Sequence, residues 1–267
     1  MEKILNNGFL DEEMYYKIVE VKCKYKKYFK ILDDINFLFY EIIDNFKGTY
    51  LNNEKMYVFP AFVQLGKLYQ SAVIMLSYGI NISFEIILRT ILELSIKIRY
   101  ALVNTINIAK MEKKSYMELK ELLDFINTNQ YYEMLKENQI NDNLIKINKN
   151  SEKYNKYKIN EQPSMFRMCK KIGALHEYVY YKQLSESIHV GYFNMKSVID
   201  VKDSKSVVIN ANEDYTDIKE KCFQLISLVV PIINEMIKRY APQLDKLKKN
   251  IKELYEQEES EWVLKKY

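Results

Sequence analysis

The spacing of apolar residues along this chain follows the three- and four-residue steps of an α-helix over most of its length. Over residues 11–46 this pattern predicts one long helix, or two helices joined near residues 33–34. The next helix is expected over residues 60–79, with Pro60 in its first turn, where a proline loses no helical hydrogen bond. The most apolar segment follows at about residues 82–109 and predicts the central helix of the core.

The second half of the chain alternates polar segments with further helical patterns. Residues 112–160 are rich in Lys, Glu and Asn and predict a polar insertion with one or two surface helices. Another helix is expected to begin at Pro163, to be interrupted at Gly173 and then to resume. Two short apolar runs within residues 197–209 predict a small β-hairpin, and residues 217–240 predict a bent helix.

Together these elements predict an all-α protein. The chain of 267 residues holds only 6 Gly and 4 Pro, so no Gly- or Pro-rich linker separates one core from another. We therefore expect a helical core over residues 59–240 that contains the polar insertion. A long helical arm is expected over residues 1–58, and a long amphipathic C-terminal helix over residues 241–267.

Composition and charge narrow the expected partners and surroundings. With 40 basic and 36 acidic residues the net charge is +4, which permits a polyanionic partner without demanding one. The three cysteines are far apart and odd in number, so they predict reduced core thiols and a cytoplasmic protein. No signal region is visible at the start, and no run reaches the roughly 18 apolar residues of a membrane span. We expect a soluble protein without a membrane partner.

A ridge of charged residues runs along the most apolar predicted helix. Its members follow one another at four-residue steps on one face: Glu85, Arg89, Glu93 and Lys97. One interpretation is a ladder of salt bridges within the helix, worth about 0.3–0.5 kcal/mol per pair. The other is an anion-binding or catalytic lining, in which the guanidinium of Arg89 holds a phosphate and Glu93 orients it. The spacing leaves both interpretations open.

A second group of polar residues lies on a later predicted helix. Helical spacing places its members on one face, with Tyr181 at the border: Tyr178, Lys182, Ser185 and His189. Histidine is the natural proton carrier near neutral pH, so His189 is the candidate for acid–base chemistry. The alternative is a hydrogen-bonded core or capping histidine.

Signatures of several common enzyme classes are absent from the sequence. It has no Gly-rich phosphate loop, no paired-cysteine metal motif and no nucleophile elbow. The other histidine, His176, lacks comparable polar neighbours, and two histidines predict no metal centre. We therefore expect neither a metal nor a cofactor. Two hypotheses for the function remain. One is metal-independent RNA cleavage, which needs one histidine with cations and hydroxyls, and the other is that the protein has no catalytic activity.

Two blocks of sequence within about residues 60–195 carry a family resemblance. The first combines residues 71–79 with the run Arg-Thr-Ile-Leu-Glu-Leu at 89–94, and the second combines residues 178–185 with His189. In order and spacing they resemble a family of uncharacterised bacterial helical proteins that looks related to the HEPN superfamily. The resemblance implies a helical bundle, homodimerisation and often metal-independent endoribonuclease activity in toxin–antitoxin or anti-phage systems. Many relatives are instead RNA-binding or assembly modules.

The catalytic signature of the HEPN superfamily is an arginine followed after four to six residues by a histidine, and this chain matches it only in part. His189 matches the histidine, whereas the arginine positions 182–184 hold Lys, Gln and Leu, so Lys182 is the cation at hand. A lysine lacks the two-pronged guanidinium and replaces arginine imperfectly at a phosphate. We expect Arg89, from the other helix, to supply that group. Glu93 resembles the polar residue that many HEPN proteins place on a neighbouring helix.

These observations predict an all-α, HEPN-like homodimer that acts as a metal-independent endoribonuclease or RNA-targeting toxin. The predicted catalytic residues are His189, Lys182, Arg89, Glu93 and Ser185. The predicted substrate-binding residues are Tyr181, Tyr178 and Arg99. RNA and a partner or regulator protein are the expected partners. The alternative is a non-enzymatic helical sensor or adaptor, or a nucleotide-binding module, that acts through protein–protein interaction.

Overall fold

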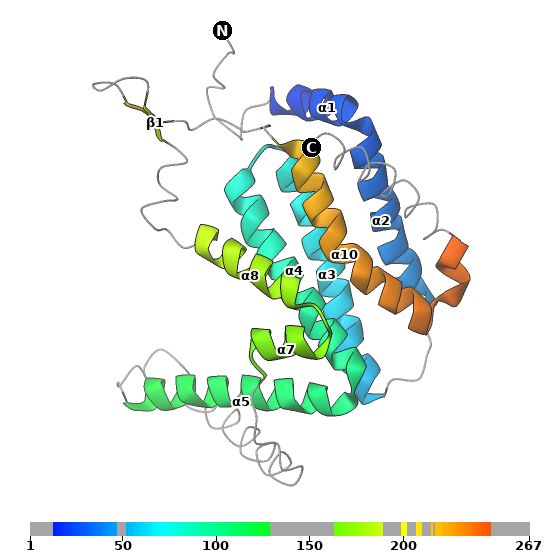
Figure 1. The fold of residues 1–267 in the computed structure, drawn as a ribbon, viewed down its shortest axis with the longest axis vertical. Helices are drawn as coiled ribbons and strands as arrows, with labels where there is room; N and C mark the ends of the chain where they lie inside the picture. Colours follow the sequence, from blue (N-terminus) through cyan, green and yellow to red (C-terminus); the bar gives the residue numbers. More distant parts are fainter. Residues whose placement is uncertain are drawn as a thin grey trace.

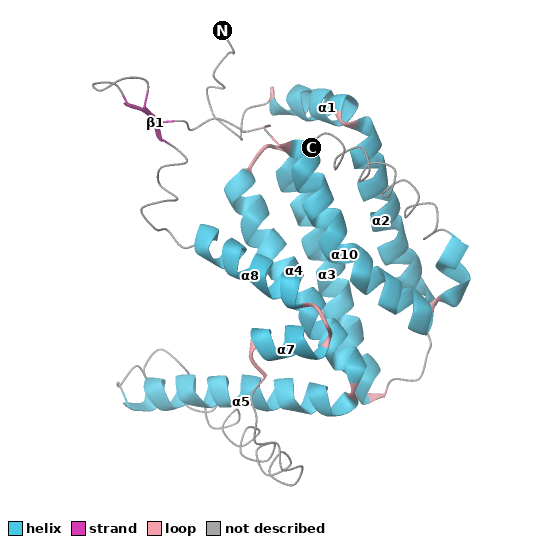
Figure 2. Cartoon of the chain, in the orientation of Figure 1, coloured by secondary structure: helices cyan, strands magenta, loops and turns pink. Residues whose placement is uncertain are grey.

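The computed structural model describes residues 13–46, 52–128, 163–188, 199–201, 207–209, 215 and 217–246 (Figure 1). The elements in these ranges are α1 (Met14–Lys24), α2 (Lys26–Asn45), α3 (Asn53–Ser77), α4 (Asn81–Val103), α5 (Thr105–Thr128), α7 (Met165–Lys171), α8 (Leu175–Ile188), β1 (Ile199–Val201), β2 (Val207–Ile209), α10 (Ile218–Tyr240) and the 3₁₀ turn η4 (Pro242–Leu244). Helices dominate this part of the chain, as Figure 2 shows. The predicted all-α class is confirmed.

Helices α3, α4 and α10 lie side by side at the centre of the molecule and share one core with α2 (Figure 1). Each helix buries large apolar side chains in this core, among them Phe39 of α2, Phe62 of α3, Leu88 of α4 and Val229 of α10. Removal of such side chains from water is the main stabilising contribution to folding. Residues of the expected N-terminal arm therefore form one wall of the core through α2.

Helices α2 and α3 pack closely because Gly66 leaves room for an aromatic ring. A Cβ atom at residue 66 would lie only 3.3 Å from Cδ1 of Phe39. The ring centroid of Phe39 lies 4.9 Å from that of Phe62 and 5.4 Å from that of Tyr69. The buried hydroxyl of Tyr69 donates a hydrogen bond to the carbonyl of Leu32 at 2.7 Å, so the aromatic cluster buries this polar atom with a partner.

Two helix starts differ from the sequence-based prediction. The first helical segment breaks at Tyr25, between α1 and α2, and not near residues 33–34. Helix α3 begins before Pro60, which lies inside it, because Asn52 provides an earlier cap. The side chain of Asn52 accepts a hydrogen bond from the backbone N–H of Lys55 at 2.8 Å, which satisfies one donor of the first turn.

The central helix α4 ends earlier than predicted, and α5 continues in a new direction across the bottom of Figure 1. Asn104 lies between them in an extended conformation, with φ −164° and ψ 136°. Its side-chain oxygen accepts a hydrogen bond from the backbone N–H of Ile106 at 3.0 Å. Arg239 of α10 donates to the carbonyl of Leu102 at 2.7 Å, so α10 holds the end of α4.

Several predicted boundaries agree with the structure. Gly79 follows α3 with φ 68° and Gly173 follows α7 with φ 71°, a conformation that favours glycine. Ser164 caps α7 by accepting a hydrogen bond from the backbone N–H of Arg167 at 3.3 Å. Strands β1 and β2 pair antiparallel within residues 197–209, where a hairpin is predicted. Of the predicted C-terminal helix, the structure describes residues only as far as 246.

The cysteines are free thiols in two different environments. Cys169 and Cys222 are buried, and burial raises the pKa of Cys222 to about 12. Cys23 is exposed on α1, so the expectation of three core thiols is wrong for this residue. Among the helices that the structure describes, none is long and apolar enough to cross a membrane.

Candidate functional site

Helix α8 packs on α4 and, with α7, covers one side of it (Figure 1). The residues of α8 that bond to α4 are Glu177, Tyr181 and Ser185, at four-residue steps. Such a step places the three side chains on one ridge of the helix. The ridge of α8 that bonds to α4 therefore differs from the face that the sequence predicts, since Lys182 lies outside this ridge and is exposed.

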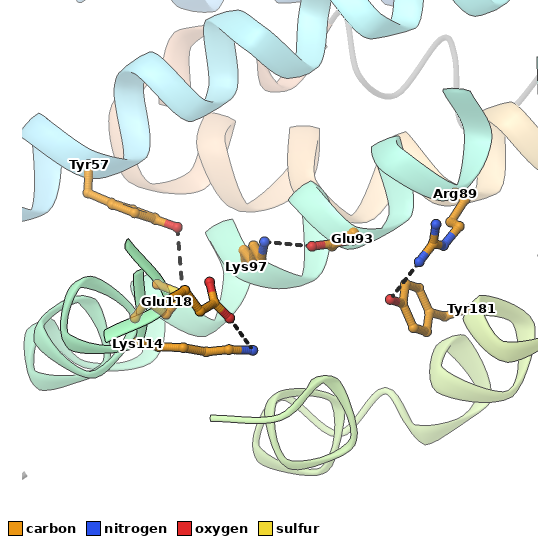
Figure 3. A network of polar contacts seen from close by, with 8 residues as sticks. Tyr57, Arg89, Glu93, Lys97, Lys114, Glu118 and Tyr181 are labelled. Atoms are coloured by element: carbon orange, nitrogen blue, oxygen red, sulfur yellow. Dashed lines mark hydrogen bonds and ion pairs between the residues drawn. The ribbon is translucent and has the colours of Figure 1, made fainter. Parts of the chain in front are cut away.

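Arg89 of α4 is anchored to α8 through two neutral oxygen atoms. Its Nε donates to Oγ of Ser185 at 3.1 Å and its Nη2 donates to the hydroxyl of Tyr181 at 3.2 Å. The guanidinium carbon also lies 5.3 Å from the centroid of the Tyr181 ring. Figure 3 shows the arginine reaching from α4 toward this ring. The Ser185 hydroxyl donates in turn to the carbonyl of Tyr181 at 2.6 Å, which orients its lone pairs toward the arginine.

Arg89 keeps a positive charge that pairs with no acidic side chain of the residues that the structure describes. Within the described ranges it forms no ion pair, and its two hydrogen-bond acceptors are uncharged. The side chain is half-buried, so water screens its charge only in part. A guanidinium in this setting can bind an anion such as a phosphate without first breaking a salt bridge.

Glu93 pairs with Lys97 and not with Arg89. The Lys97 Nζ lies 2.6 Å from Oε1 of Glu93, one turn along α4, and about a third of each side chain is exposed. Figure 3 shows this pair apart from the Arg89–Tyr181 contact. Among the described residues the ladder interpretation therefore holds for the Glu93–Lys97 step and not for Arg89, which bonds to α8 and forms no ion pair with Glu93.

Arg99 forms a second connection between α4 and α8, and this one is an ion pair. Its Nη2 donates to Oε2 of Glu177, and the two side chains are only 13% and 10% exposed. A buried pair of this kind holds two helices in register, because separation would leave a charge without a partner. The sequence-based analysis expects Arg99 to bind substrate, whereas its guanidinium is already bound to Glu177 inside the protein.

The Arg99–Glu177 pair lies next to a buried thiol of α7. Burial, and to a lesser degree the negative charge of Glu177, raises the pKa of Cys169 to about 11 against the opposing charge of Arg99. At neutral pH the thiol is therefore protonated and a poor nucleophile. Cys169 fills the junction of α4, α7 and α8 as an apolar side chain.

The other predicted site residues have different surroundings. The ring of Tyr178 packs edge-on against Phe166 of α7, with centroids 5.3 Å apart. Lys182 is exposed and makes no hydrogen bond or ion pair within the described ranges. His189 directly follows the last residue of α8 in the sequence and lies outside the described residues. His176, which lacks comparable polar neighbours in the sequence, is 83% exposed.

The sequence-based analysis missed Glu177 and Tyr180. Glu177 precedes Tyr181 by four residues, a spacing that places it on the same ridge. The hydroxyl of Tyr180 is buried without a hydrogen-bond partner in the described part of the chain. Burial, and to a lesser degree the charge of Glu85, raises the pKa of Tyr180 far above its usual range. Tyr180 carried no sequence signal, because tyrosine is abundant throughout the chain.

The described residues of this arrangement offer cations that can bind an anion. Among the described residues, no group of three or more His, Cys, Asp or Glu side chains could hold a metal. The two cations lie on neighbouring helices. Arg89 of α4 is anchored by neutral oxygens, and the side chain of Lys182 of α8 is exposed to solvent. Both can contribute to binding a phosphate group.

Comparison with known proteins places the chain in a family whose activity is unknown. A family model described as a family of unknown function, DUF5677, matches residues 55–206. This match covers more than half of the 267 residues. The chain belongs to the DUF5677 family. No curated protein and no solved structure matches it.

The DUF5677 match contains the connection between α4 and α8. It begins within α3 and ends between β1 and β2, so it includes every predicted site residue. It excludes α2 and α10, although both helices line the same core. The polar contacts of Arg89 and Arg99 therefore belong to the DUF5677 part of the chain, and part of their supporting core does not.

Proposed function

We propose that this protein is an HEPN-like, metal-independent endoribonuclease whose reactive residues gather at the C-terminal end of α8. The observation that carries the proposal is the anchoring of Arg89 to Tyr181 and Ser185, which leaves its charge without a carboxylate partner among the described residues. His189 follows Ser185 by four residues in the sequence. The resemblance of both sequence blocks to HEPN proteins supports a histidine and an arginine that act together on a phosphate.

The proposed reaction is transesterification at a ribose. His189 removes the proton of the 2′-hydroxyl, whose oxygen attacks the adjacent phosphorus. The bond from phosphorus to the 5′-oxygen breaks, and a protonated group returns a proton to that oxygen. The products are a 2′,3′-cyclic phosphate and a 5′-hydroxyl end. Arg89 and Lys182 stabilise the negative charge on the phosphorane, so the reaction needs no metal ion.

The remaining residues have supporting roles in this proposal. Ser185 and Tyr181 are positioning residues, because they fix the direction of the Arg89 guanidinium. Tyr178 offers a ring for stacking against a base. Glu93 balances charge on α4 through Lys97. Arg99 acts through Glu177 to hold α8 against α4.

A homodimer completes the proposed site. One histidine can act as a base, but the leaving oxygen needs an acid as well. Two copies related by a two-fold axis would bring two His189 side chains and their cations to one shared cleft. The resemblance to HEPN proteins supports this arrangement, with RNA as substrate and a toxin or anti-phage role for the dimer, under the control of a regulator protein.

The test is RNA cleavage in the presence of a metal chelator, with the oligomeric state measured by light scattering. His189→Ala should lower the cleavage rate by about 10²-fold or more if the histidine is the general base. His176→Ala is the matched control, since His176 is an exposed histidine of α8. Cleaved ends should carry a cyclic phosphate.

Two results would contradict the proposal: full activity in the His189→Ala protein, or a monomer at micromolar concentration. RNA binding without cleavage by the unaltered protein would favour the non-enzymatic sensor or adaptor.

A further inference from the structure

A groove of about 590 Å³ opens where α7 meets the junction of α4 and α5. Its charged side chains are all basic, and they come from two helices: Lys110 of α5 with Arg167, Lys170 and Lys171 of α7. No acidic side chain is among the described residues that line it. The groove is therefore a concentrated positive region on a protein whose net charge is only +4.

The lysines of the groove have no internal partners. Within the described ranges the side-chain ammonium groups of Lys110, Lys170 and Lys171 make no hydrogen bond and no ion pair. Like charges that converge on one concavity repel one another, and surface proteins usually intersperse both signs. A bound anion would relieve this repulsion.

Stabilisation of helix ends does not account for the whole cluster. Lys170 and Lys171 lie in the last turn of α7, where cations favour the helix dipole. Lys110 lies in the second turn of α5, near its positive end, where a cation gains nothing from the dipole. Its position beside the α7 lysines is better explained by a shared anionic ligand.

The groove is also lined by apolar residues. Val103 and Ile106 line it and remain 48% and 44% exposed, and the largely buried Tyr100 is a further lining residue. Exposed apolar side chains next to a cluster of cations suit a ligand with a flat organic part and a charged part.

We propose that this groove binds a nucleotide with two or three phosphate groups, whose phosphates contact the cations and whose base lies on Val103 and Ile106. Ligand pockets typically measure about 300–1,000 Å³, which includes the present volume. An RNA strand would call for a track of cations, whereas these converge on one bounded groove. Tyr100 lies 11 residues beyond Arg89 on α4, roughly 16 Å along the helix, so the site is distinct from the proposed nuclease site and does not depend on it.

Calorimetric titration of the full chain with ATP, without metal ions, tests the proposal. We expect millimolar or tighter binding of ATP, and weaker binding of tripolyphosphate, which lacks the base. The variants Lys110→Gln and Lys170→Gln/Lys171→Gln should each weaken ATP binding by about tenfold or more. Lys26→Gln/Lys30→Gln, which alters two exposed lysines of α2, is the matched control and should change nothing.

Several outcomes would overturn the proposal. They are no ATP binding at millimolar concentration, an equal loss in the α2 control, or tripolyphosphate binding as tight as that of ATP. An RNA oligonucleotide that binds through the groove lysines and is not displaced by ATP would also overturn it. RNA cleavage measured on the same variants separates the two proposals, because the groove substitutions should leave cleavage unchanged.

Discussion

Two arginines of α4 reach α8, and they do so in opposite ways. Arg99 is bound to the carboxylate of Glu177 in a place where both side chains are nearly buried. Arg89 is half-buried and rests on the hydroxyls of Tyr181 and Ser185. The first arrangement neutralises the guanidinium, whereas the second fixes its direction and leaves its charge available.

The difference teaches which arginine can take part in chemistry. An arginine with a buried carboxylate partner holds helices together. Removal of either partner lowers the stability of the fold, because the remaining charge stays buried without compensation. An arginine held by neutral groups can meet an incoming anion without losing a salt bridge. The two contacts therefore allow a separation of stability from activity by mutation.

The largest effect on stability is expected at the Arg99–Glu177 pair. Glu177→Gln leaves the arginine charge buried without its partner and should lower the free energy of unfolding by about 3–5 kcal/mol. Urea denaturation followed by circular dichroism measures this change. Replacement of both partners by apolar residues, Arg99→Met with Glu177→Leu, should recover much of the loss because no buried charge remains.

His176→Ala provides the neighbouring control for this pair, since His176 is exposed beside Glu177. Its effect should stay within about 0.5 kcal/mol, as for most surface substitutions. A Glu177→Gln protein as stable as the unaltered one would show that the pair does not hold α8 against α4.

The next prediction concerns Arg89 and activity. Arg89→Gln should reduce RNA cleavage by about 10²–10³-fold, the usual loss when one stabilising group of a charged transition state is removed. Its unfolding free energy should fall by only about 1–2 kcal/mol, because the lost bonds are to neutral oxygens. Single-turnover cleavage and urea denaturation of the same preparation measure both quantities.

Arg89→Lys sharpens the result. Lysine keeps the charge but cannot bond to Tyr181 and Ser185 together, so cleavage should lie between that of the unaltered protein and that of Arg89→Gln. Equal activity of Arg89→Gln and the unaltered protein would reduce Arg89 to the same structural role as Arg99.

A smaller effect is expected at the two groups that orient Arg89. Tyr181→Phe and Ser185→Ala each remove one hydrogen bond to Arg89, which should lower stability by about 0.5–1.5 kcal/mol. Ser185→Ala also removes the bond to the Tyr181 carbonyl and should lie at the upper end of this range. Cleavage should fall by less than in Arg89→Gln, because the guanidinium remains and one anchor is kept. A coupling near zero in the double mutant, relative to the two single ones, would contradict the view that they act on one arginine.

The periodicity of the sequence could predict the helices because their apolar faces are long and continuous. It could not predict the break at Asn104, because apolar residues continue through it and the break depends on side-chain hydrogen bonds: Asn104 accepts from the Ile106 N–H, and Arg239 donates to the Leu102 carbonyl. The early start of α3 was not predicted either. Pro60 is a strong signal for a helix start, whereas the Asn52 cap precedes it by two turns.

The site was predictable as a set of residues and not as a set of contacts. The sequence singled out Arg89, Ser185 and Tyr181, which the structure brings together. It could not assign partners, since four-residue spacing offers Arg89 the carboxylate of Glu93 within one helix and says nothing of a neighbouring helix. Glu177 was overlooked because its partner is 78 positions away in the sequence.

The smallest effect is expected for the partly exposed pair that neither arginine uses. Glu93→Gln removes the ion pair with Lys97, which is worth about 0.3–0.5 kcal/mol for such a spacing on a helix. Lys114 and Glu118 of α5 form an exposed pair of the same spacing, 3.6 Å apart, and Glu118→Gln is its matched control (Figure 3). Both losses should vanish in high salt, because solvent ions screen exposed charges. A loss above about 1.5 kcal/mol for Glu93→Gln alone, or a fall in cleavage as large as that of Arg89→Gln, would contradict this. Glu93 would then act in one network with Arg89. The reactive part of α4 would in that case include the charged ridge and not Arg89 alone.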